Sequence, residues 1–387
     1  MLVAFPLTVA TGRSEKGFPG ATGIADPLST DRVPISLRHR VTTHVEKAVC
    51  SVSEAEVVPP IDGLVDCTLR EGTYEMRFSR SEVEVIASTL FSAGVTHIEV
   101  GVDSARGSRL DIPCSDLVKA ATLGAPEAEV GIFAEAGSAT IESIKDSVSA
   151  GAKFVRVGVN ATEVEKSLPL VHQAKSLDIT VTLNAMKTYA VPTADVLSIA
   201  EAACSAGADL FYVVDSAGCM LPDEVNRLVS ILSDAHIPTG FHGHDNLSLA
   251  VANSLSALRA GAVAVDGTLR GAGRSAGNAQ IEVLVKVMQR AGYLKDVDGD
   301  RLADIAETLI AERRKRDRGV SHLDLVLGES RCHSGNVNFI GEVAERWNLS
   351  LHALVRAVCR RDLIHVSRAV VEAAAAELRA ANSKIRK

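Results

Sequence analysis

The sequence predicts an α/β fold: a TIM (β/α)8 barrel followed by a C-terminal helical domain. Three observations support this fold class. Eight short runs rich in β-branched residues follow one another from residue 63, each starting about 25–33 residues after the previous one, which is the length of a strand and its crossover helix. Amphipathic stretches separate these runs. After Tyr293 the runs stop, and only helical patterns follow.

The expected strands are, in order, GLVDCTL, THIEVGV, AEVGIF, KFVRVGV, ITVTLNAM, LFYVVDSAG, PTGFHGHD and AVAVDGTL. Several of the stretches between them end on an Ala-Gly step, as at Ala93-Gly94 and Ala206-Gly207, which is typical of a helix C-terminus. A doubly wound open sheet is the alternative architecture. Eight evenly spaced units favour a closed barrel over residues 63–292.

The chain divides into three predicted parts. Residues 1–60 hold six of the twelve prolines and show no sustained period, which indicates a partly disordered extension with one short helix near residues 37–50. A lid or a partner-binding arm is the alternative for this extension. Residues 61–295 form the barrel, the expected catalytic domain. Residues 296–387 carry the helical segments LADIAETLIAERRKRDRG, NVNFIGEVAERWNLSLHALVRAVCRRD and HVSRAVVEAAAAELRAAN.

Composition excludes several classes of protein. A net charge of -7 and 4% aromatic residues argue against a nucleic-acid partner, and the charge run ERRKRDRG is better explained as a solvated helix face. No stretch approaches about 18 uninterrupted apolar residues, so we expect no membrane span, and no basic region precedes the first apolar run, so we expect no secretory signal. The seven cysteines are scattered without a CxxC pair, which favours a cytoplasmic protein.

Polar residues that follow the expected strands are the candidate site residues, because the active site of a TIM barrel lies at the C-terminal ends of its strands. The first, sixth, seventh and eighth strands supply them: Asp66, Arg70, Glu71 and Tyr74; Asp215 and Ser216; His242, His244, Asp245 and Asn246; Arg270, Arg274 and Asn278.

The HGH segment is the most informative of these motifs. Residues two apart on a strand point to the same side, so His242 and His244 can share one metal ion, and Glu71 can complete a 2-His-1-carboxylate face. Arg70 beside Glu71 can stabilise the enolate of a metal-bound 2-keto acid. The alternatives are two unrelated polar histidines and a surface salt bridge. The GAGRSAGN segment is either a phosphate-binding loop or a tight turn beside the substrate.

The segments DCTLREG, HGHDNLSLAVANS and GTLRGAGRSAGNAQIEVLV resemble those of the DRE-TIM metallolyases, which are metal-dependent pyruvate aldolases and related condensing enzymes. Within that superfamily the chain looks most like the 4-hydroxy-2-oxovalerate aldolases. This likeness extends through FVRVGVNATEVEKS, MKTYAVP and YVVDSAGCMLPDEV into the helical tail, over about residues 63–381. The first sixty residues have no counterpart in it.

The resemblance implies a role for each matching position. Glu71 falls on the metal-binding acid, where the aldolases usually have Asp and homocitrate synthase-like enzymes have Glu. His242 and His244 fall on the metal histidines, and Asn278 on an asparagine near or on the metal. Arg70 falls on the arginine that steadies the enolate. The implied ion is Mn²⁺ or Mg²⁺, with Zn²⁺ or Co²⁺ as alternatives.

One departure from the aldolase pattern concerns the general base. Tyr74 stands where the aldolases have a histidine proposed as the base, and His333 aligns close to their active-site tyrosine. The two residue types have therefore exchanged places, and His333 is the candidate base because histidine titrates near neutral pH. The alternative is a surface histidine in the loop CHSGN. Asp215 and Ser216 are expected to bind substrate.

These observations predict a divalent-metal lyase that joins pyruvate, as its enolate, to an aldehyde, in biosynthesis or aromatic catabolism. A Claisen-type condensation of an acyl-CoA with a 2-keto acid is one alternative, and a non-catalytic partner-binding barrel is another. The resemblance also implies that the C-terminal domain pairs with an aldehyde dehydrogenase or forms a homodimer.

Overall fold

The computed structural model describes residues 63–103, 112–314 and 319–385. The predicted helix near residues 37–50, like the rest of the N-terminal extension, lies outside these described residues. No helix within them is long and apolar enough to span a membrane.

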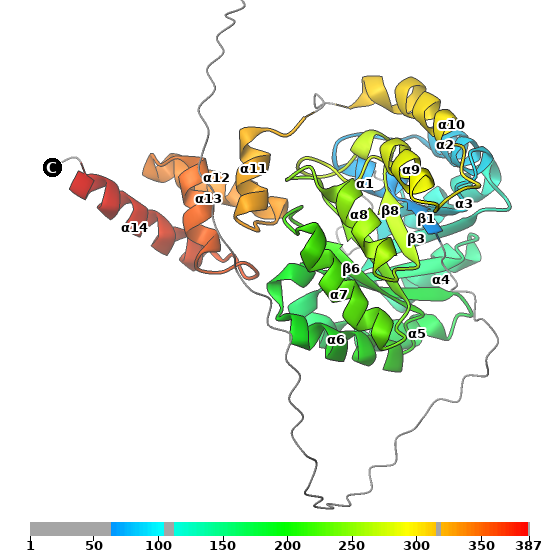
Figure 1. Ribbon diagram of the computed structural model, residues 1–387, viewed down its shortest axis with the longest axis horizontal. Coiled ribbons are helices and arrows are strands. Elements are labelled where there is room, and N and C mark those ends of the chain that lie inside the picture. The colour runs from blue at the N-terminus through cyan, green and yellow to red at the C-terminus, as the bar shows by residue number, and fades with distance from the viewer. Residues whose placement is uncertain (1–62, 104–111, 315–318, 386–387) are drawn as a thin grey trace, which may run out of the picture. The chain divides into compact units, whose positions relative to one another are not determined.

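Eight parallel strands close into a barrel in sequence order, so the predicted TIM barrel is confirmed (Figure 1). The last strand pairs with the first along its whole length, from Gly63 opposite Ala264 to Asp66 opposite Gly267. The strands are β1 Gly63–Asp66, β2 His97–Asp103, β3 Glu129–Glu135, β4 Phe154–Asn160, β5 Thr180–Met186, β6 Leu210–Asp215, β7 Thr239–Gly243 and β8 Ala264–Gly267.

Helices follow the strands and form the outer ring. They are α1 Thr68–Glu71, α2 Arg80–Ser92, α3 Cys114–Gly124, α4 Ile141–Ser149, α5 Leu168–Lys175, α6 Thr193–Ser205, α7 Pro222–Asp234, α8 Ala250–Arg259 and α9 Ile281–Arg290. The local sequence sets their ends. Ser79 and Glu82 make a capping box at the start of α2, and Pro222 occupies the first turn of α7.

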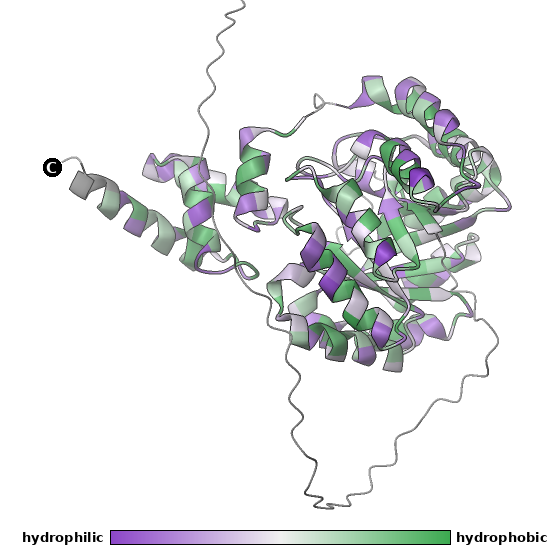
Figure 2. Cartoon of the chain, viewed as in Figure 1, coloured by the Kyte–Doolittle hydropathy of each residue, from purple (hydrophilic) through white to green (hydrophobic). Residues whose placement is uncertain are grey.

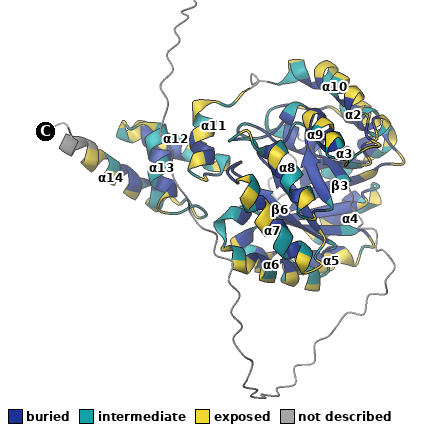
Figure 3. Ribbon diagram, in the orientation of Figure 1, coloured by how far each residue is buried: buried dark blue, intermediate teal, exposed yellow. Residues whose placement is uncertain are grey.

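Burial in the barrel follows the hydropathy of the sequence. The strands are mostly apolar and buried, while the helices expose their polar faces (Figures 2 and 3). The main hydrophobic cluster lies between strands and helices, and a smaller cluster that includes Phe154 and Tyr212 fills the barrel interior. The interior also contains three fully buried charged residues, Glu99, Arg156 and Asp266.

The tail is helical, as the sequence predicts. It contains α10 Gly299–Ile305, a π-helical turn at Ala306–Ile310, α11 His322–Glu329, α12 Val337–Trp347, α13 Leu351–Cys359 and α14 Arg368–Ile385. Ile305 and Ile310 belong to the hydrophobic cluster of the barrel, whereas Val326 begins a separate cluster formed by α11 to α14. A left-handed residue, Asn348, ends α12.

Candidate active site at the C-terminal end of the barrel

Glu71, His242 and His244 form a compact group of ligand atoms. One atom from each lies within 4.8 Å of the others, and the residues are only 2%, 3% and 7% exposed. The histidines follow one another along the end of β7 with ring centroids 5.4 Å apart, and Glu71 ends α1. Glu71 Oε2 is buried without a hydrogen-bond partner. An orphaned carboxylate oxygen beside two imidazoles fits a divalent cation.

The protonation states of this group suit a metal. Burial alone would raise the pKa of Glu71, but the Arg70 guanidinium and the two imidazoles hold it at about 2. Burial lowers the pKa of His244 to about 4. At neutral pH the carboxylate is therefore charged and the imidazole neutral, which are the states that bind metals.

Arg70 is fixed from two sides. Its Nε donates to Glu99 Oε2 at 2.7 Å, a second guanidinium nitrogen donates to Glu71, and the guanidinium carbon lies 4.8 Å from the centre of the Phe133 ring. A guanidinium held in this way cannot swing toward solvent. It presents its charge beside the carboxylate of the predicted metal site.

A buried chain of charges supports the site from inside the barrel. Asp266 Oδ2 accepts a hydrogen bond from His242 Nδ1 at 2.7 Å and from Arg156 at 2.5 Å. Arg156 also lies 3.5 Å from Glu99, so it connects the carboxylates that hold His242 and Arg70. Because Nδ1 of His242 is engaged with Asp266, Nε2 is left for the metal.

Sequence reasoning missed Glu99, Arg156 and Asp266. Their signal was present, because each is a charged residue within an otherwise apolar strand segment, IEVGV, FVRVGV or AVAVDG. A charge at such a position is buried only when it is paired.

A cavity of about 510 Å³ opens above the ligand group. Its lining includes both residues of the predicted exchange, Tyr74 and His333, together with Lys187 and Arg274. The guanidinium carbon of Arg274 lies 3.8 Å from the centre of the Tyr74 ring. His333, between α11 and α12, enters the cavity from the helical tail.

The hydrogen bond of His333 bears on its predicted role. Its Nδ1 accepts from the Gly335 backbone N–H at 3.2 Å, so the neutral ring carries its proton on Nε2. Burial, with the positive charges of Arg274 and Lys187, lowers its pKa to about 3. In this arrangement His333 presents a hydrogen-bond donor at Nε2, whereas the general base expected from the sequence needs a free acceptor there.

The remaining predicted residues divide between cavity and scaffold. Ser216 lines the cavity, where its Oγ accepts from the Lys187 backbone N–H at 3.0 Å. The Asp215 carboxylate accepts from the backbone N–H groups of Cys219 and Met220, so the structure places it in a buried turn and not among the cavity residues. Asp66 likewise bonds to Thr68.

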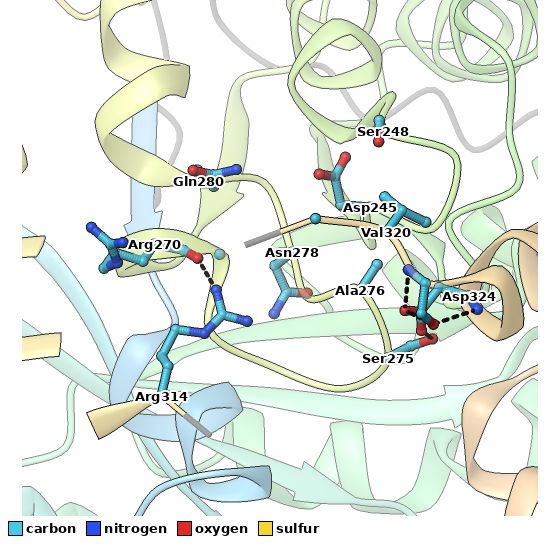
Figure 4. A pocket seen from close by; sticks show the side chains of 13 residues that line it. Asp245, Ser248, Arg270, Ser275, Ala276, Asn278, Gln280, Arg314, Val320 and Asp324 are labelled. Carbon is cyan, nitrogen blue, oxygen red and sulfur yellow. Dashed lines mark hydrogen bonds between the residues drawn. The ribbon is translucent and has the colours of Figure 1, made fainter. Parts of the chain in front are cut away.

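A second cavity of about 440 Å³ lies where the loop after β8 meets the start of α11 (Figure 4). Asn278, Asp245 and Arg270 line it, the first with Nδ2 donating to Ala272 and Oδ1 buried without a partner. An ideal Cβ on Gly273 would lie 2.2 Å from Asn278 Nδ2 and 3.2 Å from Glu71 Oε2, so Asn278 lies close to the ligand group.

The other residues of this second cavity join the barrel to the tail. Ser275 Oγ, in the GAGRSAGN segment, donates to Asp324 at 2.8 Å, and Asn246 Nδ2 donates to the Asp324 carbonyl at 3.1 Å. Asn246 also donates to Ser275, at 2.7 Å. The segment therefore acts as a turn that fixes α11 beside the site.

Comparison with known proteins agrees with this geometry. The family model described as HMGL-like matches residues 63–309. The chain is 33% identical to 4-hydroxy-2-oxovalerate aldolase of Moorella thermoacetica, over 78% of this chain and 92% of the relative. It is 32% identical to the enzyme of that name from Brevibacillus brevis, over 84% and 98%, and 34% identical to an oxaloacetate decarboxylase of Mycobacterium tuberculosis, over 76% and 89%.

Solved structures share the fold. The carboxyl transferase domain of Rhizobium etli pyruvate carboxylase superposes with a TM-score of 0.68 at 17% identity, over 82% of this chain and 61% of that one. The N-terminal domain of a Bacteroides vulgatus protein superposes with a TM-score of 0.64 at 24% identity, over 76% and 99%.

Proposed function

The chain belongs to the HMGL-like family and is a metal-dependent lyase, and from that premise we propose that it breaks or forms the C–C bond between pyruvate and an aldehyde. The resemblance of its motifs to the DRE-TIM metallolyases is thereby confirmed. The observation that carries the proposal is the placement of Glu71, His242 and His244 beside a fixed Arg70 at the floor of a closed-sided cavity.

A divalent ion held by Glu71, His242 and His244 would supply Lewis acidity toward the carboxylate and keto oxygens of a 2-keto acid. We propose Mn²⁺ or Mg²⁺, because two imidazoles and one carboxylate accept Mn²⁺ readily; Zn²⁺ and Co²⁺ are the alternatives. Arg70 holds its positive charge where the enolate oxygen forms, and the Glu99 hydrogen bond prevents it from reorienting as the charge develops.

Proton transfer is assigned to the open side of the cavity. Because His333 keeps its Nδ1 on Gly335 and its proton on Nε2, it donates a hydrogen bond to the substrate oxygen. Tyr74 is left as the cavity side chain that accepts the C4 hydroxyl proton during cleavage and returns it during condensation.

Two substitutions test this function. Glu71→Gln and His242→Ala should abolish both Mn²⁺-dependent release of pyruvate from 4-hydroxy-2-keto acids and Mn²⁺-dependent exchange of the methyl protons of pyruvate with D₂O, measured by NMR. Glu135→Gln is the matched control, because Glu135 is an exposed carboxylate on the same cavity. Exchange that persists in the two variants would contradict the proposal.

Oxaloacetate decarboxylation is the second candidate. It would form the same enolate and needs no proton acceptor for C–C cleavage, which suits a His333 that has none free; a relative of similar identity carries that name. A Claisen condensation would release a thiol from acetyl-CoA, and a non-catalytic barrel would bind no Mn²⁺ on titration. Pairing of the tail with an aldehyde dehydrogenase or a second copy of the chain remains a proposal, tested by co-purification.

A further inference from the structure

Two cations on the open side of the active-site cavity lack a carboxylate partner. The charge of Arg70 is balanced by Glu71 and Glu99, but neither Lys187 nor Arg274 forms an ion pair with any residue that the structure describes. Arg274 lies against the Tyr74 ring, and Lys187 is half-buried at the end of β5.

The carboxylates nearest to Lys187 are already engaged. Glu163 bonds to Lys166 and Asn160, and Asp362 accepts the backbone N–H groups of Ile364 and His365. Glu135 lies on the same cavity but is exposed and forms no ion pair with Lys187. Half-buried cations without partners are costly, so an anion in the cavity would be stabilised.

The two cations converge on His333. Both lie near enough for their charges to disfavour protonation of its ring, and Arg274 acts in the same way on His244. Arg274 thus lies between the ligand group and His333, and Lys187 lies beyond it. A substrate whose 2-keto acid end is at Glu71 and His244 would extend its far end toward the Lys187 ammonium and the His333 Nε2–H.

We propose that this far end is a carboxylate, so that the enzyme acts on 4-hydroxy-2-keto dicarboxylates with Lys187 and Arg274 binding the second carboxylate. This inference rests on the proposed lyase function. In cleavage the C3–C4 bond breaks, its electron pair stays on C3 as the enolate of pyruvate, and the C4 hydroxyl proton passes to Tyr74. C4 becomes the carbonyl carbon of an aldehyde that keeps its carboxylate, as in glyoxylate.

The same contacts disfavour decarboxylation. If the carboxylate held by Lys187 and Arg274 left as neutral CO₂, its ion pairs would be lost in the transition state, so they would stabilise the bound substrate and slow the reaction. A carboxylate retained in the product keeps these ion pairs throughout. Oxaloacetate should therefore be a poorer substrate than 4-hydroxy-2-oxoglutarate.

The test compares kcat/KM for 4-hydroxy-2-oxoglutarate, 4-hydroxy-2-oxovalerate and oxaloacetate in wild type and in Lys187→Met, which keeps length but removes charge. We expect the wild type to prefer the 4-hydroxy dicarboxylate at least about tenfold over the other two, since a charge-assisted hydrogen bond is worth that factor or more. Lys187→Met should lower the dicarboxylate-to-monocarboxylate ratio by about the same factor, and Lys187→Arg should restore most of it. Lys145→Met, on the exposed face of α4, is the matched control and should leave the ratio unchanged.

Two results separate failure of this inference from failure of the proposed function. Mn²⁺-dependent exchange of pyruvate protons with equal kcat/KM for dicarboxylate and monocarboxylate, unaltered in Lys187→Met, overturns the dicarboxylate assignment alone. A preference for oxaloacetate that Lys187→Met weakens also overturns it, in favour of decarboxylation. Absence of both exchange and cleavage overturns the proposed function itself.

Discussion

Two histidines of the site use Nδ1 in opposite ways. His242 donates from Nδ1 to the buried carboxylate of Asp266, which leaves an unprotonated Nε2 for a metal. His333 accepts at Nδ1 from a backbone N–H, which leaves a protonated Nε2 for a substrate oxygen. Side chains of one type therefore serve as a ligand in one case and as a donor in the other, and the partner atom decides which.

The donor role of His333 predicts a graded series of variants. His333→Gln keeps an N–H donor and should retain more activity than His333→Ala, which should lose about 10- to 100-fold in kcat/KM because a donor to developing negative charge is removed. Since the pKa of His333 is about 3, the ring is neutral throughout pH 5–8. The wild-type profile of kcat/KM against pH should show no limb that depends on His333. A limb near pH 6.5 that disappears in His333→Ala would instead indicate the general base expected from the sequence.

His244 predicts acid sensitivity of the metal-free protein. An unfolded histidine protonates near pH 6.5, whereas folded His244 does so near pH 4, so between these values the unfolded state binds more protons and the free energy of unfolding falls as pH falls. The full effect is roughly 3 kcal/mol at about 1.4 kcal/mol per pH unit. Urea unfolding in EDTA at pH 7 and pH 5 measures it, and His244→Gln should flatten the dependence. A slope unchanged in that variant would assign the effect to other groups.

At the scale of elements, the turn after β6 holds the loop after β7 in place. Gly218 has a positive φ of +57°, and a Cβ there would lie 2.4 Å from Asn246 N and 2.8 Å from the His244 carbonyl oxygen. The Asp215 carboxylate fixes the same turn through Cys219 and Met220. The turn thus supports the metal-ligand loop although it offers no ligand.

Gly218→Ala should therefore weaken metal binding without altering a ligand. We expect the Mn²⁺ dissociation constant to rise at least about tenfold, and the free energy of unfolding to fall by more than the 1–2 kcal/mol of a left-handed non-glycine residue. Gly292→Ala is the matched control, because Gly292 also has a positive φ but a Cβ there meets nothing within 4 Å. Titration of Mn²⁺ and urea unfolding of both variants provide the comparison; equal effects in the two would show that backbone strain, and not the close approach, is responsible.

At the scale of the whole molecule, one buried arginine connects both halves of the site across the barrel. Arg156 on β4 lies between Glu99 on β2 and Asp266 on β8, and its guanidinium carbon lies 4.2 Å from the centre of the Tyr212 ring on β6. These four strands surround the barrel axis. Removing the arginine leaves two carboxylates buried without their shared partner.

Arg156→Met should cost about 3–5 kcal/mol of stability, as expected when one member of a buried ion pair is removed. It should also weaken Mn²⁺ binding, because Asp266 would no longer be held against His242. Arg80→Met is the control: Arg80 pairs with Asp116 on the surface, and its loss should cost under about 1 kcal/mol. Denaturant unfolding and Mn²⁺ titration test this, and an Arg156→Met protein as stable as Arg80→Met would contradict it.

The sequence by itself determined the barrel and most of the ligand group. Period, β-branched runs and Ala-Gly steps are local properties, so they identify eight strand–helix units, and the spacing of His242 and His244 places both on one side of β7. The position of Glu71 after a buried strand indicated its nearness to them only through the known geometry of a closed barrel.

The tertiary structure decided which charged groups face one another across the barrel and which reach the cavity. Glu99, Arg156 and Asp266 lie on strands far apart in the chain, and strand closure alone brings them into contact. The proton position on His333 and the unpaired state of Lys187 likewise depend on neighbours from other elements. Local sequence cannot encode such contacts, because hydrogen bonding and desolvation are properties of the three-dimensional surroundings.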